Sequence, residues 1–227
     1  LVSTTFIVAV WFFWRGMRDG KVWDFFVAGA TAGASQYTGV AARLLPLVIL
    51  LSLSGWLGHG RHFWRARWKG LVSMCAAALI VFLPLGRAFL LHPGWFGRRM
   101  QTAAPLSALL PNLGRTLGGW LWIGGSALHS LPGRPIYDPA MGSLLVLGAA
   151  VALWKIRRPA YSVWLAWFLG VLPGSFLSEP TPMFYRVTPA VPATAALCAV
   201  GGEQIWQFAA ARWPRLRKAT AVLLLSL

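Results

Sequence analysis

Long apolar runs separated by short basic segments dominate the pattern of this sequence. A helix needs about 20 mostly apolar residues to cross roughly 30 Å of bilayer hydrocarbon. Four runs approach that length and composition, namely 70–91, 139–154, 160–178 and 187–208. The chain also starts within an apolar stretch, 1–14, and stops within another. We therefore expect a piece of a longer membrane protein, with a truncated helix at each end.

The apolar stretch 25–57 needs a separate interpretation. As one helix rising about 1.5 Å per residue it would be roughly 50 Å long, too long for a single crossing. Arg43 and Pro46 also lie near its middle. We predict two short helices, about 25–38 and 43–58, with a turn near Gly39. This brings the expected number of complete transmembrane helices to about six.

Composition agrees with a membrane protein and excludes two other classes. The 227 residues are 57% hydrophobic and 11% charged, yet the formal net charge is +16. So few charges cannot cover a water-exposed surface, and a soluble nucleic-acid-binding protein carries more of them. The 14% aromatic content excludes a disordered chain. We predict an all-α integral membrane protein, a multi-pass helical bundle that forms a single transmembrane region over 1–227.

The positions of the basic residues predict the orientation of the helices. Short cytoplasmic loops carry an excess of Lys and Arg. Fourteen of the 21 basic residues fall in four clusters, and with six crossings all four lie on the cytoplasmic side of a cell membrane. These clusters are Arg15, Arg18 and Lys21; Arg61, Arg65, Arg67 and Lys69; Lys155, Arg157 and Arg158; and Arg212, Arg215, Arg217 and Lys218.

The other seven basic residues are all arginine, and this topology places them on or near the outer face. They are Arg43, Arg87, Arg98, Arg99, Arg115, Arg134 and Arg186. Only two acids, Asp138 and Glu179, accompany them there. The guanidinium fork suits phosphate and carboxylate, so this surface is typical of a site for an anionic ligand. The alternative is that the arginines extend toward lipid headgroups, which we favour for Arg87 and Arg115.

The outer segment of about 92–138 is too long for a simple connection. Its amphipathic part, 113–123, contains Trp120 and Trp122 and predicts a short helix lying on the membrane surface. The segment ends in the stiff sequence LPGRPIYDP, 131–139. Two interpretations stay open there: a ligand clamp around Arg134 and Asp138, or Asp138 as the N-cap of the next helix ahead of Pro139.

Other motifs add little chemistry. The histidines and acids show no metal-binding spacing, and no GxSxG or Walker A sequence occurs. Cys75 and Cys198 are interpreted as buried, unreactive side chains. The spacings Gly29–Gly33 and Gly170–Gly174 predict close packing of helices.

Four ordered segments resemble one family of membrane enzymes. They are DFFVAGATAGASQYTGVAARLLPLVILL (24–51), HPGWFGRR (92–99), LPGRPIYDPAMG (131–142) and the run from IRRPAY to TPAVPA (156–193). Together they resemble bacterial GT-C superfamily glycosyltransferases of the dolichyl-phosphate-mannose protein mannosyltransferase-like group. The resemblance covers most of the chain.

The resemblance implies an enzyme that moves a sugar from a polyprenyl-phosphate donor to an acceptor hydroxyl on the extracytoplasmic face, with inversion. It implies that the catalytic acid lies upstream of Leu1, and that the acceptor is a glycan, a lipid or a protein. Some members use a metal, so a divalent cation is the one cofactor it allows. Met183 departs from the pattern, because relatives often have histidine there. The residues that coincide with family motifs are Arg43, Arg99, Arg134 and Arg186 for the donor phosphate, with Tyr37, Asp138 and Glu179 as neighbouring candidates.

Two other functions are compatible with the residues. A transporter or flippase for an anionic lipid-linked substrate would also use arginines, although no internal repeat or midplane charge supports it. A structural membrane subunit without a ligand would not need the long outer segment. Membrane lipid is an expected partner in every case, and nucleic acid in none.

Overall fold

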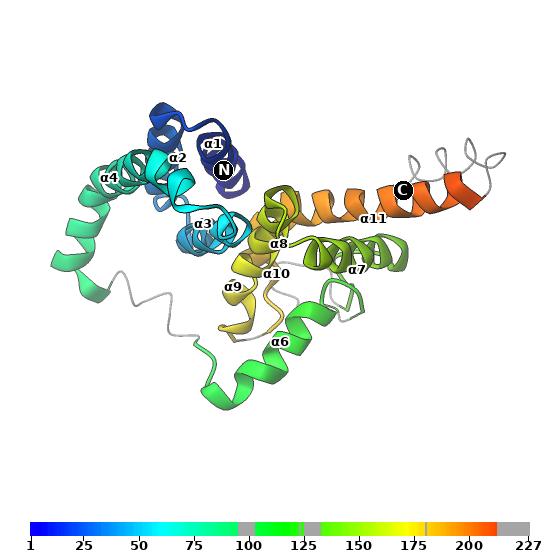
Figure 1. Ribbon diagram of the computed structural model, residues 1–227. Coiled ribbons are helices and arrows are strands. Elements are labelled where there is room, and N and C mark those ends of the chain that lie inside the picture. Colours follow the sequence, from blue (N-terminus) through cyan, green and yellow to red (C-terminus); the bar gives the residue numbers. More distant parts are fainter. Residues whose placement is uncertain (95–102, 123, 125–132, 180, 213–227) are drawn as a thin grey trace.

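The computed structural model describes residues 1–94, 103–122, 124, 133–179 and 181–212, and most of these residues are helical (Figure 1). The α-helices are α1 (Val2–Asp19), α2 (Val22–Ser35), α3 (Leu45–Ser52), α4 (Arg61–Leu91), α6 (Leu109–Gly118), α7 (Pro139–Trp154), α8 (Pro159–Val171), α9 (Pro173–Phe176), α10 (Phe184–Val187) and α11 (Val191–Arg212). Four short 3-10 helices join them, namely η1 (Val40–Leu44), η2 (Leu53–Trp56), η3 (Leu106–Ala108) and η4 (Thr188–Ala190).

The predicted break in the apolar stretch 25–57 is confirmed. Helix α2 ends at Ser35, and η1 begins at Val40 after a turn. The side-chain amide of Gln36 donates a hydrogen bond to the Ala42 carbonyl at 2.9 Å, which closes the turn. Pro46 sits in the first turn of α3, where a missing N–H costs nothing.

Glycine contacts set the spacing of the helices, as the small-residue pattern predicts. A Cβ placed on Gly29 of α2 would lie 2.0 Å from the Met74 carbonyl oxygen of α4. The same test on Gly170 of α8 gives 2.9 Å to a methyl carbon of Val48 in α3. Helices α7 and α11 approach as closely, where Gly148 faces Leu197. These three pairs are in backbone or near-backbone contact, and only glycine permits that distance.

One hydrophobic core joins the helices of the described residues. Helices α1 to α4 form one group in Figure 1, α7 and α11 lie on the other side, and α8 to α10 lie between them. Phe6 of α1 contacts Trp167 of α8, with ring centroids 6.1 Å apart, and both side chains are fully buried. Helix α8 is therefore the central element that ties the two groups together.

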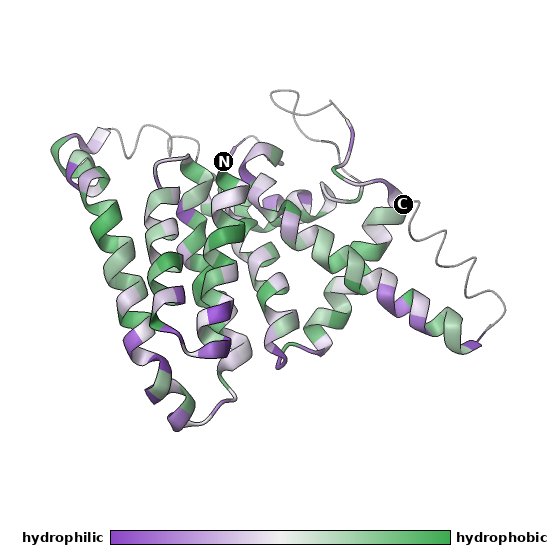
Figure 2. Ribbon diagram, turned by 90° about the horizontal axis from the view of Figure 1, so that it is seen from above, coloured by the Kyte–Doolittle hydropathy of each residue, from purple (hydrophilic) through white to green (hydrophobic). Residues whose placement is uncertain are grey.

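Three of the four basic clusters meet at one end of the helices, as the topology predicts. The Arg67 guanidinium donates to the main-chain carbonyls of Met17 and Arg18, so the first two clusters touch. Gly55 of η2 packs on Pro159, which follows the third cluster. Figure 2 shows hydrophilic residues at these helix ends and hydrophobic ones along the helices between.

Among the described residues, only α4 is both long and apolar enough to cross a membrane. Two apolar helical stretches, Val40–Trp56 and Pro139–Trp154, are shorter. Helix α8 has 13 residues because the predicted 160–178 helix is interrupted ahead of Pro173. The structure thus shows an all-helical chain with one candidate span, and the multi-pass arrangement stays a prediction.

Several predicted helix boundaries were wrong, and so was the predicted burial of Cys75. Helix α4 begins at Arg61, not at 70, so the second basic cluster lies on its first turns and not in a loop. The predicted amphipathic helix 113–123 is also shifted: α6 occupies 109–118 and ends at Gly118. The 187–208 helix is a short α10 and η4 followed by α11, with Pro189 and Pro192 at the junctions. Cys198 is buried as expected, but Cys75 is exposed on the outward face of α4.

Candidate functional site

A small cavity brings two of the predicted arginines together, at the end of the helices opposite the basic clusters. It has a volume of about 160 Å³ and lies between η1, α9 and α10. Arg43 comes from η1 and Arg186 from α10, so residues far apart in the sequence share one site. We call it the arginine cavity, and its lining residues are Val40, Ala41, Arg43, Leu44, Ala103, Pro173, Gly174, Leu177, Ser178 and Arg186.

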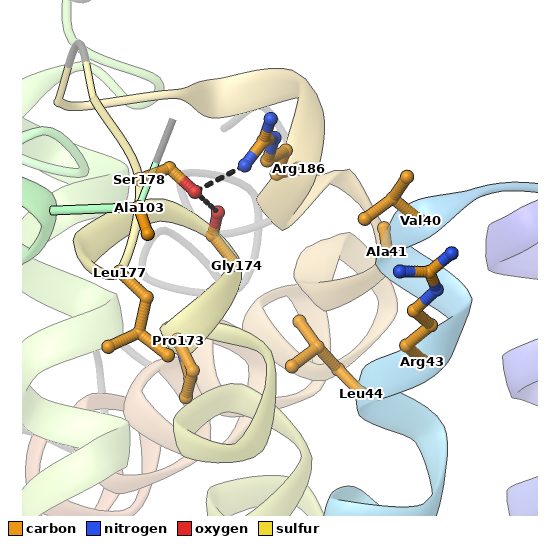
Figure 3. Close-up of a pocket in the computed structure, with 10 residues that line it drawn as sticks. All are labelled: Val40, Ala41, Arg43, Leu44, Ala103, Pro173, Gly174, Leu177, Ser178 and Arg186. Carbon is orange, nitrogen blue, oxygen red and sulfur yellow. Dashed lines mark hydrogen bonds between the residues drawn. The ribbon is translucent and has the colours of Figure 1, made fainter. Parts of the chain in front are cut away.

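Arg186 is held in place by hydrogen bonds on two sides. Its Nη1 donates to the Ser178 hydroxyl, and its Nε donates to the Tyr185 hydroxyl at 2.9 Å. The Ser178 hydroxyl in turn donates to the Gly174 carbonyl at 3.0 Å (Figure 3). The orientation of this guanidinium is therefore coupled to the backbone of α9.

Arg43 reaches the same cavity from the opposite wall. Its side chain is half-buried, and the guanidinium carbon lies 5.6 Å from the centroid of the Phe89 ring of α4. In Figure 3 both guanidinium groups lie above the apolar side chains of Leu44, Pro173 and Leu177. The site thus combines a cationic rim with an apolar floor, which suits a ligand with an anionic head and an apolar body.

Buried polar contacts fix the α9 wall. Ser175 is fully buried, and its hydroxyl accepts hydrogen bonds from the Thr116 hydroxyl at 3.0 Å and from the Met183 main-chain N–H at 2.9 Å. The Asn112 side chain donates to the Phe176 carbonyl at 3.4 Å. Helix α6 therefore packs against α9 through polar side chains on its inner face, and not only through apolar ones.

A second, larger cavity of about 650 Å³ contains Arg134. Tyr137, Asp138 and Phe184 also line it, and Phe184 belongs to α10 together with Arg186. Both cavities are therefore lined in part by the short helix α10. Burial raises the pKa of Tyr137 above its ordinary value, although its 2.6 Å hydrogen bond with Thr194 opposes part of the shift.

Asp138 is the N-cap of α7, as one of the two interpretations of LPGRPIYDP predicts. Its Oδ1 accepts hydrogen bonds from the N–H groups of Ala140 and Met141, at 2.8 and 2.9 Å, and Pro139 is the first helical residue. These bonds satisfy free donors at the helix start. The other interpretation, a clamp around Arg134 and Asp138, is compatible with their shared cavity and stays a prediction.

The remaining predicted residues do not line the arginine cavity. The Tyr37 hydroxyl donates to the Val81 carbonyl of α4 at 2.9 Å, which ties the turn to that helix. Glu179 is exposed beside the cavity residue Ser178. Arg87 and Arg115 are exposed. Arg99 lies outside the described residues.

Ser178 is the site residue that the sequence did not reveal. Sequence reasoning selected its charged neighbour Glu179, whereas the structure places the serine hydroxyl on Arg186. A serine in a loop carries no spacing signal, so only the tertiary contact identifies it. No group of three His, Cys, Asp or Glu side chains that could hold a metal ion occurs among the described residues.

Comparisons of the chain with protein-family models, curated proteins and solved structures found no match. The resemblance to GT-C glycosyltransferases therefore rests on the sequence segments alone. Over the residues that the structure describes, the fold defines a helical protein with one candidate membrane span.

Proposed function

We propose that this chain is part of a membrane glycosyltransferase that takes a sugar from a polyprenyl-phosphate donor. The observation that carries the proposal is the arginine cavity, where Arg43 and Arg186 stand over an apolar floor. A polyprenyl phosphate is a lipid with an anionic head, so its site must offer cations beside apolar surface. The resemblance of four sequence segments to GT-C enzymes supports the same function.

In this reaction the acceptor hydroxyl oxygen attacks the anomeric carbon while the bond from that carbon to the phosphate oxygen breaks. The sugar is transferred with inversion, and the polyprenyl phosphate leaves with added negative charge. Positioned arginines stabilise that developing charge. By resemblance to GT-C enzymes, a carboxylate takes the proton of the acceptor hydroxyl. Arg134, in the neighbouring cavity, is available to the same phosphate or to the sugar.

The proposal includes a multi-pass bundle with the arginine cavity on the extracytoplasmic side. Three observations support it: the break between α2 and α3, the meeting of three basic clusters at one helix end, and the position of the arginine cavity at the other end. Helices shorter than the hydrocarbon thickness can be accommodated by local thinning of the bilayer.

The test is turnover of a fluorescent polyprenyl-phosphate sugar by the full-length protein in vesicles. Arg43→Ala and Arg186→Ala are each expected to lower kcat about 100-fold, because each removes a preorganised donor from the leaving phosphate. Arg43→Lys should recover part of the loss, since it keeps the charge but not the planar fork. Arg115→Ala is the matched control, because this exposed arginine lies outside the cavity.

Unchanged turnover in both alanine variants would overturn the assignment of the cavity to the donor phosphate. The rival function, a transporter or flippase, predicts a different result. In that case the labelled lipid crosses the bilayer while the bond between sugar and phosphate stays intact.

A further inference from the structure

An apolar groove separates α1 from α8, away from the arginine cavity. Its volume is about 370 Å³, and four tryptophans line it: Trp11 and Trp14 from α1, and Trp164 and Trp167 from α8. Trp167 is buried at its base, whereas Trp11 is 56% exposed at its edge. From Ile7 to Trp14 the groove follows two turns of α1, or roughly 10 Å. This length fits within one leaflet, which is about 15 Å deep.

Two arginines stand at the basic end of this groove, where Ala160 begins its α8 wall. Arg157 and Arg158 directly precede α8, and both are exposed. Neither forms an ion pair within the part of the chain that the structure describes.

Three of the neighbouring cations at this end already have partners. Arg15 pairs with Asp24 at 2.9 Å, and Arg18 pairs with Asp19. The ammonium group of Lys155 lies 5.1 Å from the centroid of the Tyr161 ring. The two acids of this end are therefore used by Arg15 and Arg18, which leaves the charge of Arg157 and Arg158 for an external anion.

We propose that the groove between α1 and α8 binds an acyl chain of an anionic diacyl phospholipid, with the lipid phosphate at Arg157 and Arg158. Arg157 and Arg158 precede Ala160 of the groove lining by three and two residues, so exposed cations adjoin an apolar groove, and a phospholipid with net negative charge complements this distribution. A neutral transmembrane helix or a second copy of this chain would leave the two arginines without a counterion. The site is independent of glycosyl transfer, since it lies at the other end of the helices from Arg43.

The test uses the quenching of tryptophan fluorescence by lipids with dibrominated acyl chains. The full-length protein is reconstituted into phosphatidylcholine vesicles that contain increasing fractions of dibrominated phosphatidylglycerol or dibrominated phosphatidylcholine. Phosphatidylglycerol should quench at lower mole fraction, with a saturable excess over phosphatidylcholine. Removal of each arginine should lower the relative affinity for phosphatidylglycerol about fivefold.

Two pairs of variants separate the groove from general attraction to an anionic surface. The double variant Arg157→Gln and Arg158→Gln should lose the preference for phosphatidylglycerol. The control Arg61→Gln and Arg65→Gln removes the same charge from exposed positions on α4 and should keep it. Ala160→Phe fills the groove and should reduce quenching by both lipids, whereas Ala66→Phe on α4 should not.

Equal quenching by the two lipids in the native protein would overturn the proposal, as would equal effects of the two arginine pairs. Weak quenching by both lipids, unaffected by Ala160→Phe, would mean that protein fills the groove, and this also overturns it. Glycosyltransferase activity is not part of the readout, so either proposal can fail without the other.

Discussion

At the scale of single residues, the chemistry of the arginine cavity depends on groups that hold arginines in place. Ser178 is buried and links Arg186 to the Gly174 carbonyl. Ser175 performs a comparable task for the α9 wall, through Thr116 and Met183. Without the Ser178 hydroxyl the long Arg186 side chain would sample more rotamers and would bind an anion less tightly.

Ser178→Ala is therefore expected to weaken donor binding while the protein stays folded. Loss of a hydrogen bond to a charged group costs about 1.5–3 kcal/mol, so KM for the donor should rise roughly tenfold or more. The measurement is KM and kcat for the polyprenyl-phosphate sugar. Ser143→Ala is the matched control, because the Ser143 hydroxyl donates to the Pro139 carbonyl at an exposed position of α7 that does not line the cavity. A KM equal to that of the native protein would show that Ser178 does not position Arg186.

At the scale of elements, small residues decide how closely the helices pack. Gly29 of α2 packs against Met74 of α4, and Gly33 packs against Ala78 one turn further along both helices, so the two helices run in the same direction. If both helices lie in a bilayer, as the proposed function requires, the hydrophobic effect does not drive them together, and van der Waals contact at such close approach is the main stabilising term. The periodic spacing of glycines in the sequence predicted this contact, although not which helix would be the partner.

Gly29→Ala is expected to destabilise the folded protein. The added methyl would overlap the Met74 carbonyl, and overpacking of this kind typically costs about 1–3 kcal/mol. Gly114→Ala in α6 is the matched control: it meets no atom within 4 Å, and replacement of an exposed helical glycine stabilises by about 1 kcal/mol. The midpoint of thermal unfolding in detergent should fall for the first variant and rise slightly for the second. Equal shifts for both would contradict the close α2–α4 contact.

At the scale of the whole molecule, the charges divide between two ends of the helices. The basic clusters meet at one end, where Arg67 joins the ends of α1 and α4. The cavities that contain Arg43, Arg186 and Arg134 lie at the opposite end. If the chain spans a membrane as proposed, the positive-inside rule predicts that the first end faces the cytoplasm.

This orientation predicts which side of the membrane a water-soluble thiol reagent reaches. In a protein whose native Cys75 and Cys198 are replaced by serine, Glu179→Cys should react with an impermeant maleimide in intact cells. His59→Cys should react only after the membrane is opened. Both positions are exposed, so a difference in labelling reports sidedness. Labelling of His59→Cys alone in intact cells would reverse the predicted orientation.

The sequence by itself determined the helical class, the break near Gly39 and the close-packing glycines, and it offered the cap at Asp138 as one of two interpretations. Each of these depends on residues that are near one another along the chain, where local rules of periodicity, turn chemistry and capping apply. Helix ends were predicted less well, because Arg61 to Lys69 can extend a helix as readily as form a loop.

Only the tertiary structure decided which charged residues form a site. In the structure Arg43 and Arg186 line one cavity, and the Ser178 hydroxyl accepts a hydrogen bond from Arg186. Tyr37 and Glu179 do not line that cavity. The reason is physical: charge and spacing along the chain limit what a residue can do, but the packing of α3 on α8 determines which distant side chains meet. The position of α1 beside α8, where Phe6 contacts Trp167, also created a tryptophan groove that no motif in the sequence indicates.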